Sequence, residues 1–193
     1  EIRDGAFSRC PDLKTVVIPD SVQVIGYDAF YNDEGLVSVT FGRGIREVCS
    51  YAFYGCTSFE RAIFPGGAIK FESSVFLRCT SLREVRIPEG TERIEGGMFE
   101  DCKALAAIEF PETIRRISGY AFDGCDALQE LVFPESFDFV DNYWSEYTNL
   151  TSLVFKGAPP FFEDGDGDCF APLFWPNMPV TVPEEFADEW DAF

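Results

Sequence analysis

A period of 23 residues runs through most of this 193-residue chain and constrains its fold more than any other feature. Phenylalanine recurs at this spacing, and columns of cysteine, leucine, valine or isoleucine, and proline follow it in step. The phenylalanines are Phe7, Phe30, Phe53, Phe76, Phe99 and Phe122. A fixed period of about 20–50 residues is typical of a solenoid, in which each unit packs on its neighbours. We therefore expect one continuous core along a stack of units.

Each unit contains the pattern Leu-x-x-Val-x-Ile-Pro, which predicts a turn followed by a short strand. Val16 and Ile18 are two residues apart and point to the same side of a strand, whereas Val17 points to the other. Proline lacks a backbone donor and is expected where the strand ends. The Ala-Phe-x-x-Cys segment, as in Ala6 to Cys10, has the spacing of one short helical or 3-10 turn. The pattern predicts an α+β repeat protein with short parallel strands.

The whole unit, Ile-Gly-x-x-Ala-Phe-x-x-Cys-x-x-Leu-x-x-Val-x-Ile-Pro-x-x-Val, resembles the BspA-like (treponemal-type) leucine-rich repeat. Its clearest copy begins Ile-Ser-Gly-Tyr-Ala-Phe-Asp-Gly-Cys at residues 117–125. The resemblance covers residues 2 to about 156, and the segment 180–183 with Trp190 resembles the family's closing segment. It implies a leucine-rich-repeat solenoid, which we expect to be right-handed. It also implies a secreted or cell-surface bacterial protein that adheres to host proteins or to other cells.

The repeats divide the chain into residues 1–156, with about seven units of 22–23 residues, and a C-terminal segment, residues 157–193. The seventh unit is degenerate. The open end of a solenoid would expose its core and a strand edge. We therefore expect the C-terminal segment, which is rich in proline and aromatic residues, to cap the solenoid. Because Glu1 and Ile2 are already in register, we also expect the chain to be a fragment of a longer protein.

Charge and histidine content exclude several functional classes. The net charge is −19, whereas a nucleic-acid-binding protein needs a basic surface. The chain contains no histidine, which rules out Ser-His-Asp and Cys-His catalysis and imidazole metal sites. No run of about 18 apolar residues is present to span a membrane. Residues 117–193 carry 16 acidic groups and one lysine, and this half either serves solubility or steers cationic partners toward itself.

Five of the seven cysteines occupy the same position in the unit and are expected to form a column of buried, reduced thiols. Disulfides need facing Cβ vectors, and zinc needs converging ligands. A column of parallel side chains offers neither arrangement. Cys49 and Cys169 fall outside the column and are the two candidates for a reactive thiol.

The acidic segment 163–168 resembles a calcium loop, because Asp164, Asp166 and Asp168 have the spacing of the first three EF-hand ligands. Cys169 then stands where glycine is required, and Trp175 stands where glutamate is required. We expect a solvated acidic loop, with weak cation binding as the alternative. The remaining carboxylates lie in no pocket-forming motif, so we predict no catalysis, no metal and no cofactor.

The outward side chains of the strands form the predicted binding face, because repeats place equivalent side chains in rows on a rigid platform. The candidates are Arg61, Arg83, Glu84, Arg86, Glu109 and Val132. Arg61 beside Glu84, and Arg86 beside Glu109, are either ion pairs within the sheet or a mixed-charge patch for a partner. We predict a non-catalytic extracellular protein-binding or adhesion module. Its partner is a protein or glycan of a host or neighbouring cell. The alternative is an auxiliary recognition module of a larger secreted enzyme.

Overall fold

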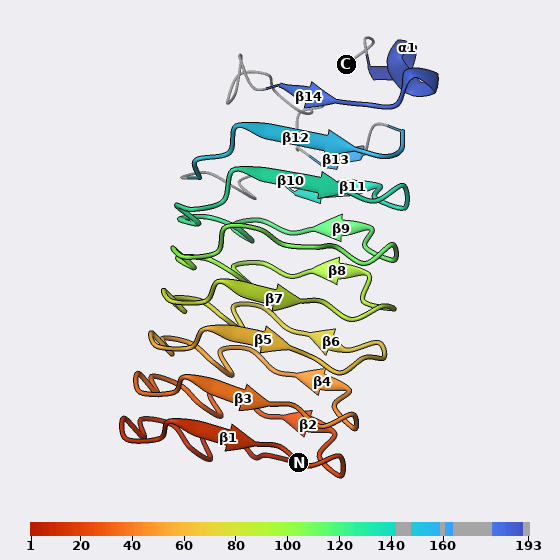
Figure 1. Cartoon of the computed structure of the whole chain (residues 1–193). Helices are drawn as coiled ribbons and strands as arrows, with labels where there is room; N and C mark the ends of the chain where they lie inside the picture. The colour runs from red at the N-terminus through yellow and green to blue at the C-terminus, as the bar shows by residue number, and fades with distance from the viewer. Residues whose placement is uncertain (142–147, 159–160, 164–178, 191–193) are drawn as a thin grey trace.

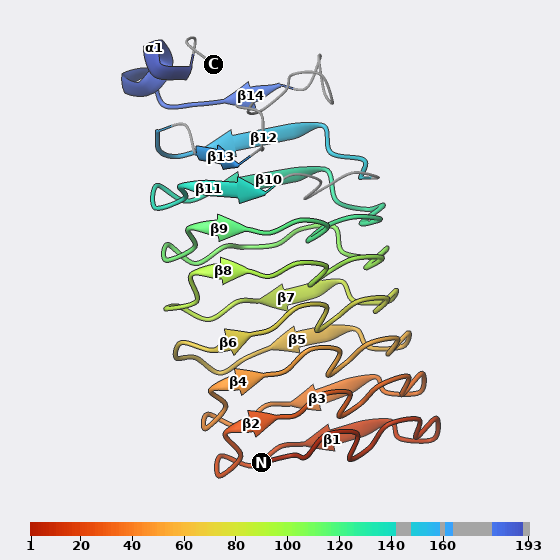
Figure 2. The ribbon, with the colours of Figure 1, turned by 180° about the vertical axis from the view of Figure 1, so that it is seen from behind.

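The computed structural model describes residues 1–141, 148–158, 161–163 and 179–190. The chain winds into a parallel β-solenoid of about six turns, stacked from the N-terminus at one end to the C-terminal helix at the other (Figure 1). Most turns contribute one strand to each of two strand series. The strands of one series run across the coil in the direction opposite to those of the other (Figures 1 and 2).

The Leu-x-x-Val-x-Ile segments form the first strand series, as predicted. Its members are β1 Thr15–Val17, β3 Ser38–Thr40, β5 Arg61–Ile63, β7 Glu84–Arg86, β10 Glu130–Phe133, β12 Ser152–Phe155 and β14 Val180–Thr181. Neighbouring strands pair in parallel, and the register follows the period, with Val16 opposite Val39. Between β7 and β10 an isolated bridge from Arg86 to Glu109 continues the ladder. The period therefore determines both the strands and their register.

A second series of shorter strands forms around the last apolar column of each unit. Its members are β2 Val24–Ile25, β4 Glu47–Val48, β6 Lys70–Phe71, β8 Arg93–Ile94, β9 Arg116–Ile117, β11 Phe139–Asp141 and β13 Phe161–Glu163. These strands also pair in parallel, in the groups β2-β4-β6 and β8-β9-β11-β13. Most have only two residues, which is too short for an alternating pattern to be recognised in the sequence.

The predicted helical turns are wrong for the repeat units. The Ala-Phe-x-x-Cys segments are tight turns, and the helical residues within the described ranges are confined to η1 Glu184–Phe186 and α1 Ala187–Trp190. Here the backbone N–H groups donate partly to carbonyls of the next turn of the solenoid and partly to carbonyls of their own turn. Those of Asp28 and Phe30 donate to the next turn, whereas that of Tyr31 donates within its own turn. An α-helix would need every one of these donors internally. The result is a β-solenoid with almost no helix.

The core is a stack of repeated side chains. The rings of Phe53, Phe76 and Phe99 are fully buried and lie parallel, with neighbouring centroids 5.7 Å apart. The cysteine column lies beside them, and in four turns the thiol donates to the carbonyl of a phenylalanine 26 residues earlier, as from Cys79 Sγ to Phe53 O at 3.0 Å. Four cysteines of the column are buried free thiols, and so is Cys49 outside the column. Cys10, the first of the column, is a free thiol that is exposed. Each buried thiol of the column thus has a hydrogen-bond acceptor that recurs with the repeat.

Both strand series extend beyond the regular turns. Strand β13 pairs with β11, and β14 pairs with β12, each in parallel. The 3-10 helix η1 and helix α1 follow β14 directly. These pairings connect residues of the C-terminal segment 157–193 to the ladders of the repeats.

Candidate functional site

The strand face is the solvent-exposed side of the first strand series, and it contains all the candidate binding residues. In β3, β5 and β7 the middle residue is buried and its neighbours are more exposed, as in β7, where Val85 lies between exposed Glu84 and Arg86. Pro88, which ends this segment, is buried. The face is therefore a set of parallel rows of side chains, one rung per turn. Arg61, Arg83, Glu84, Arg86, Glu109 and Val132 all lie in exposed positions on or next to these rows.

One of the two predicted charge pairs forms an ion pair. Arg61 and Glu84 lie opposite each other in the ladder, and their side chains meet at 2.8 Å from Nε to Oε2 and 3.1 Å from Nη2 to Oε1. Arg83 makes a similar contact with Glu60 across the same two turns, at 2.5 Å. Both pairs are about half exposed, and such pairs contribute about 0–1 kcal/mol to stability. Their main effect is to fix the guanidinium groups.

Arg86 and Glu109 behave differently although their spacing is the same. Their backbones are joined by an isolated parallel bridge, but within the described ranges neither side chain takes part in an ion pair. Both are exposed. Glu84 lies in strand β7, whereas Glu109 is joined to its neighbour by a single isolated bridge and belongs to no strand. The middle of the strand face therefore presents two opposite charges that remain available.

Apolar side chains continue the same row toward the C-terminal end. Val132 lies opposite Val154 in the pairing of β10 with β12. Val132 is 36% exposed, and at the other end of the row Val17 is 75% exposed. The row that includes Arg86 and Glu109 thus passes from charged to apolar within a few rungs.

The outward side chains of the second strand series were missed by sequence reasoning, and they carry more ion pairs. Lys70 on β6 contacts Glu47 at 2.5 Å and Glu72 at 3.4 Å. Arg116 on β9 contacts Asp141 at 2.7 Å. In four of the five two-residue strands, β4, β6, β8 and β9, a charged residue precedes an apolar one, and this is the signal that the sequence offers for this face.

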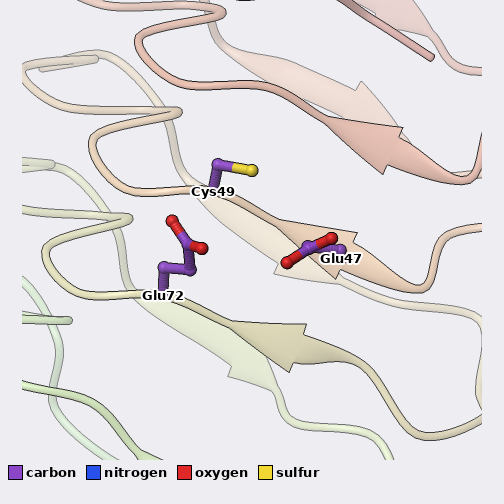
Figure 3. A group of neighbouring side chains, drawn as sticks. All are labelled: Glu47, Cys49 and Glu72. Atoms are coloured by element: carbon purple, nitrogen blue, oxygen red, sulfur yellow. The ribbon is translucent and has the colours of Figure 1, made fainter.

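Cys49 lies on this second face, close to two carboxylates (Figure 3). The ligand atoms of Glu47, Cys49 and Glu72 lie within 4.8 Å of one another. Burial, followed by the two nearby carboxylates, raises the pKa of the Cys49 thiol to about 11. A thiol with so high a pKa is almost entirely protonated at neutral pH and is a poor nucleophile. The structure therefore places Cys49 in the wrong environment for a reactive cysteine.

The two carboxylates near Cys49 already have partners. Glu72 Oε2 accepts hydrogen bonds from the backbone N–H of Ser50 at 3.0 Å and from its hydroxyl at 3.2 Å. Burial opposes ionisation of Glu72, but these bonds and one from Tyr27 outweigh it and lower the pKa of the carboxyl. The Lys70 ammonium group supplies the positive charge between Glu47 and Glu72. These contacts explain the cluster without a metal ion. Cys169 and the loop from Asp164 to Asp168 lie outside the described residues.

Comparison with known families identifies the repeat. A family model described as the BspA type leucine rich repeat region matches residues 1–126 and 93–170, with six copies. The chain belongs to this family. Leucine-rich repeats of this kind are typically non-catalytic binding modules. No functionally curated protein matches the chain.

Solved structures support the same fold. A leucine rich cell surface protein from Faecalibacterium prausnitzii is 29% identical with a TM-score of 0.70, and the match covers 80% of this chain and 42% of that protein. A leucine-rich repeat protein from Eubacterium ventriosum is 20% identical with a TM-score of 0.57, over 79% and 46% of the two chains. The T. pallidum leucine rich repeat protein is 18% identical with a TM-score of 0.53, over 99% and 75%. The chain thus spans less than half the length of the first two relatives.

Membership of the BspA-type family explains which residues are buried, but it does not determine which residues occupy the surface positions. The residues that define the repeat, such as Phe76, Cys79 and Leu82, are fully buried. Arg86, Glu109 and Val132 occupy the variable position between the valine and isoleucine columns. Burial fixes the former, whereas the latter are free to differ from turn to turn. In the part of the chain that the structure describes, no helix is long and apolar enough to cross a membrane.

Proposed function

We propose that this BspA-type repeat is a non-catalytic, extracellular or cell-surface protein-binding module, and that its ligand is bound on the strand face. The observation that carries the proposal is the charge arrangement at Arg86 and Glu109. Both side chains are exposed and lie on adjacent rungs, and among the described residues neither is engaged in an ion pair. A protein partner with charges of complementary sign can pair with both groups.

The neighbouring apolar row strengthens the case for a protein partner. Protein interfaces combine an apolar centre with a polar rim. Val132 and Val154 continue the row beyond Glu109, and the fixed pairs Arg61–Glu84 and Arg83–Glu60 join the turn of Arg86 to the turn before it. This order gives a partner both apolar contact area and charged groups that set its orientation.

The rigidity of the platform favours binding there. The residues beneath the face are fully or almost fully buried, including Leu82, Val85 and Leu131. A surface that is ordered before binding loses little conformational entropy when a partner is bound. Several weak contacts along consecutive rungs can therefore add up to useful affinity.

The relatives support a cell-surface setting. The similar protein from F. prausnitzii is described as a cell surface protein. An exposed location on a bacterium brings the strand face into contact with proteins of a host or of neighbouring cells. A net charge of −19 keeps such a chain soluble and disfavours nucleic-acid binding.

The test is a binding comparison between surface variants. The chain is first screened against a panel of purified extracellular-matrix and plasma proteins, and the strongest partner is then titrated. We expect the double variant Arg61→Ala, Arg86→Ala to keep its thermal stability and to lose at least tenfold in equilibrium affinity. The single variants apportion this loss, with the larger share expected from Arg86, whose charge is not paired within the sheet.

The matched control removes two arginines from the other face. Arg93 and Arg115 are also exposed and take part in contacts with Glu95 at 3.7 Å and Asp138 at 2.9 Å. The double variant Arg93→Ala, Arg115→Ala therefore changes the net charge by the same amount and should bind normally. Equal losses in the two double variants would mean that only overall charge matters. Unchanged affinity in the strand-face variant would place the ligand elsewhere.

A further inference from the structure

A second surface feature lies away from the strand face, on the ridge formed by the Ala-Phe-x-x-Cys turns. Three successive turns meet there in an open hollow of about 450 Å³, lined by Ser8, Arg9, Asp28, Tyr31, Tyr51 and Tyr54. The volume lies in the range of about 300–1,000 Å³ that is typical of small-ligand sites. A protein interface needs a much larger and flatter area, so the hollow suits a small ligand.

Aromatic and cationic groups form an ordered stack along the hollow. The rings of Tyr31 and Tyr54 lie parallel with their centroids 4.6 Å apart. Arg9 lies over Tyr31 at 5.9 Å, and Arg78 lies over Tyr54 at 5.8 Å. Arg78 Nη1 also donates to the Tyr54 hydroxyl at 2.9 Å. These contacts fix both phenol rings before any ligand is bound.

Tyr51 is the exposed ring of the group, and the stack holds it in place. Its ring meets that of Tyr54 edge to face, at a centroid distance of 6.0 Å and an interplanar angle of 68°. Tyr51 is 43% exposed, so much of its apolar surface faces solvent. An exposed aromatic ring held by a neighbouring ring is a preorganised surface for stacking.

The backbone at Tyr51 is left-handed, as it is at the equivalent position of the other described units. Tyr51 has a φ of 59°, in the left-handed region that bulky side chains rarely adopt. The equivalent residues have the same conformation: Gly5 and Gly97 have a φ of 62°, and Asp28, Ser74 and Tyr120 have φ values of 53°, 60° and 59°. Glycine adopts this conformation without steric cost. The left-handed conformation therefore belongs to the turn itself, and glycine can replace Tyr51 without disturbing the backbone.

The charges around the hollow select the ligand class. Arg9 and Asp28 are both exposed and of opposite sign, and Arg78 at the edge lies 3.6 Å from Asp101. The lining therefore offers donors and acceptors with no excess of either charge. A sugar ring has an apolar C–H face that stacks on an aromatic ring and hydroxyls that both donate and accept. We propose that this hollow binds a neutral glycan, with Tyr51 as the stacking residue and Arg9 and Asp28 as the hydrogen-bonding residues.

The site is independent of the protein-binding face. None of its lining residues belongs to the strand series, and the double variant Arg61→Ala, Arg86→Ala should leave glycan binding unchanged. Either proposal can therefore fail without the other.

The decisive variant is Tyr51→Gly, which removes the ring and relieves the backbone at the same time. The matched control is Tyr120→Gly, because Tyr120 occupies the equivalent position three turns on, with a φ of 59° and 47% exposure, outside the hollow. Both variants are titrated by NMR with maltotriose, cellotriose and triacetylchitotriose. An anionic arm uses 3′-sialyllactose and a heparin disaccharide.

We expect at least one neutral trisaccharide to shift the resonances of Tyr31, Tyr51 and Tyr54. Tyr51→Gly should weaken that binding at least tenfold without lowering the melting temperature, whereas Tyr120→Gly should bind like the wild type. Asp28→Asn keeps a residue that tolerates the left-handed backbone and should weaken trisaccharide binding at least threefold. This variant tests the proposal if Tyr51→Gly does not fold. Absence of binding by every neutral probe, binding by the anionic probes alone, or full affinity in both hollow variants would overturn the proposal.

Discussion

Replacing Phe76 by alanine tests the packing that defines this solenoid. Phe76 is fully buried at the middle of the phenylalanine column. Its ring lies 5.7 Å from those of both Phe53 and Phe99, nearly parallel to each. The ring also stacks on Phe59 at 6.3 Å, so the substitution removes three stacking contacts at once and leaves a cavity between neighbouring turns.

The expected loss in the free energy of unfolding can be worked out from these contacts. Truncation of a buried phenylalanine costs about 3–5 kcal/mol through lost transfer free energy and the cavity. The three stacking contacts, at about 0.5–1.5 kcal/mol each, place this site near the upper end of that range. For a chain of this size 1 kcal/mol corresponds to about 2–4 °C, so the melting temperature should fall by about 8–20 °C.

Phe7 provides the matched control in the same column. It is 41% exposed and stacks on one side only, on Phe30 at 5.3 Å. We expect Phe7→Ala to lose less than half as much stability as Phe76→Ala, because less area is buried and one stacking contact is lost. Urea unfolding followed by circular dichroism gives both values, and hydrogen exchange shows whether the loss is centred on the turns around residue 76. Equal losses, or a loss below about 1 kcal/mol for Phe76→Ala, would refute the proposed packing.

Three further predictions concern buried and paired charges. The free energy of unfolding should fall as pH rises above about 9. Thiols of the unfolded chain ionise near their ordinary pKa of 9.0, whereas burial raises the pKa of the folded Cys49 thiol to about 11. Denaturant titrations at pH 7–10.5 measure how the free energy of unfolding changes with pH. Asp33→Asn should stabilise the chain at pH 7 by about 1 kcal/mol, because burial raises the pKa of the Asp33 carboxyl and disfavours its charge. This gain should shrink as pH falls through the folded-state pKa of Asp33, and its persistence at pH 3 would contradict the explanation. Arg61→Ala should cost less than about 1 kcal/mol, since its pair with Glu84 is half exposed, and 1 M salt should reduce even that difference.

Asp33 illustrates what the sequence alone does not predict. It stands where the column has cysteine, which the sequence presents only as an irregularity. In the structure Asp33 is fully buried and its Oδ1 accepts a hydrogen bond from the backbone N–H of Cys10 at 2.7 Å. Its Oδ2 has no hydrogen-bond partner among the described residues. The regular backbone of the neighbouring turns maintains the geometry even where the side chain costs free energy.

The turns mark the limit of prediction from spacing. Ala-Phe-x-x-Cys has the spacing of a helical turn. The residue types at Tyr51 and Arg78 do not indicate the positive φ that both have in the structure. The left-handed residues follow from hydrogen bonds to the next turn of the solenoid, which exist only once the units are stacked. Local spacing therefore predicted the wrong element, and the contacts between turns decided the right one.

The sequence by itself determined the repeat, the parallel first strand series, its register and the buried columns, because each of these depends on contacts between residues 23 apart that recur along the chain. Only the tertiary structure decided that Arg61 pairs with Glu84, whereas Arg86 and Glu109 form no ion pair with any residue that the structure describes. It also decided that three tyrosines from two turns gather in one hollow. Burial repeats with the period and can be read from it. Side-chain conformation at the surface depends on the particular neighbours of each residue, and those neighbours are set when the turns stack.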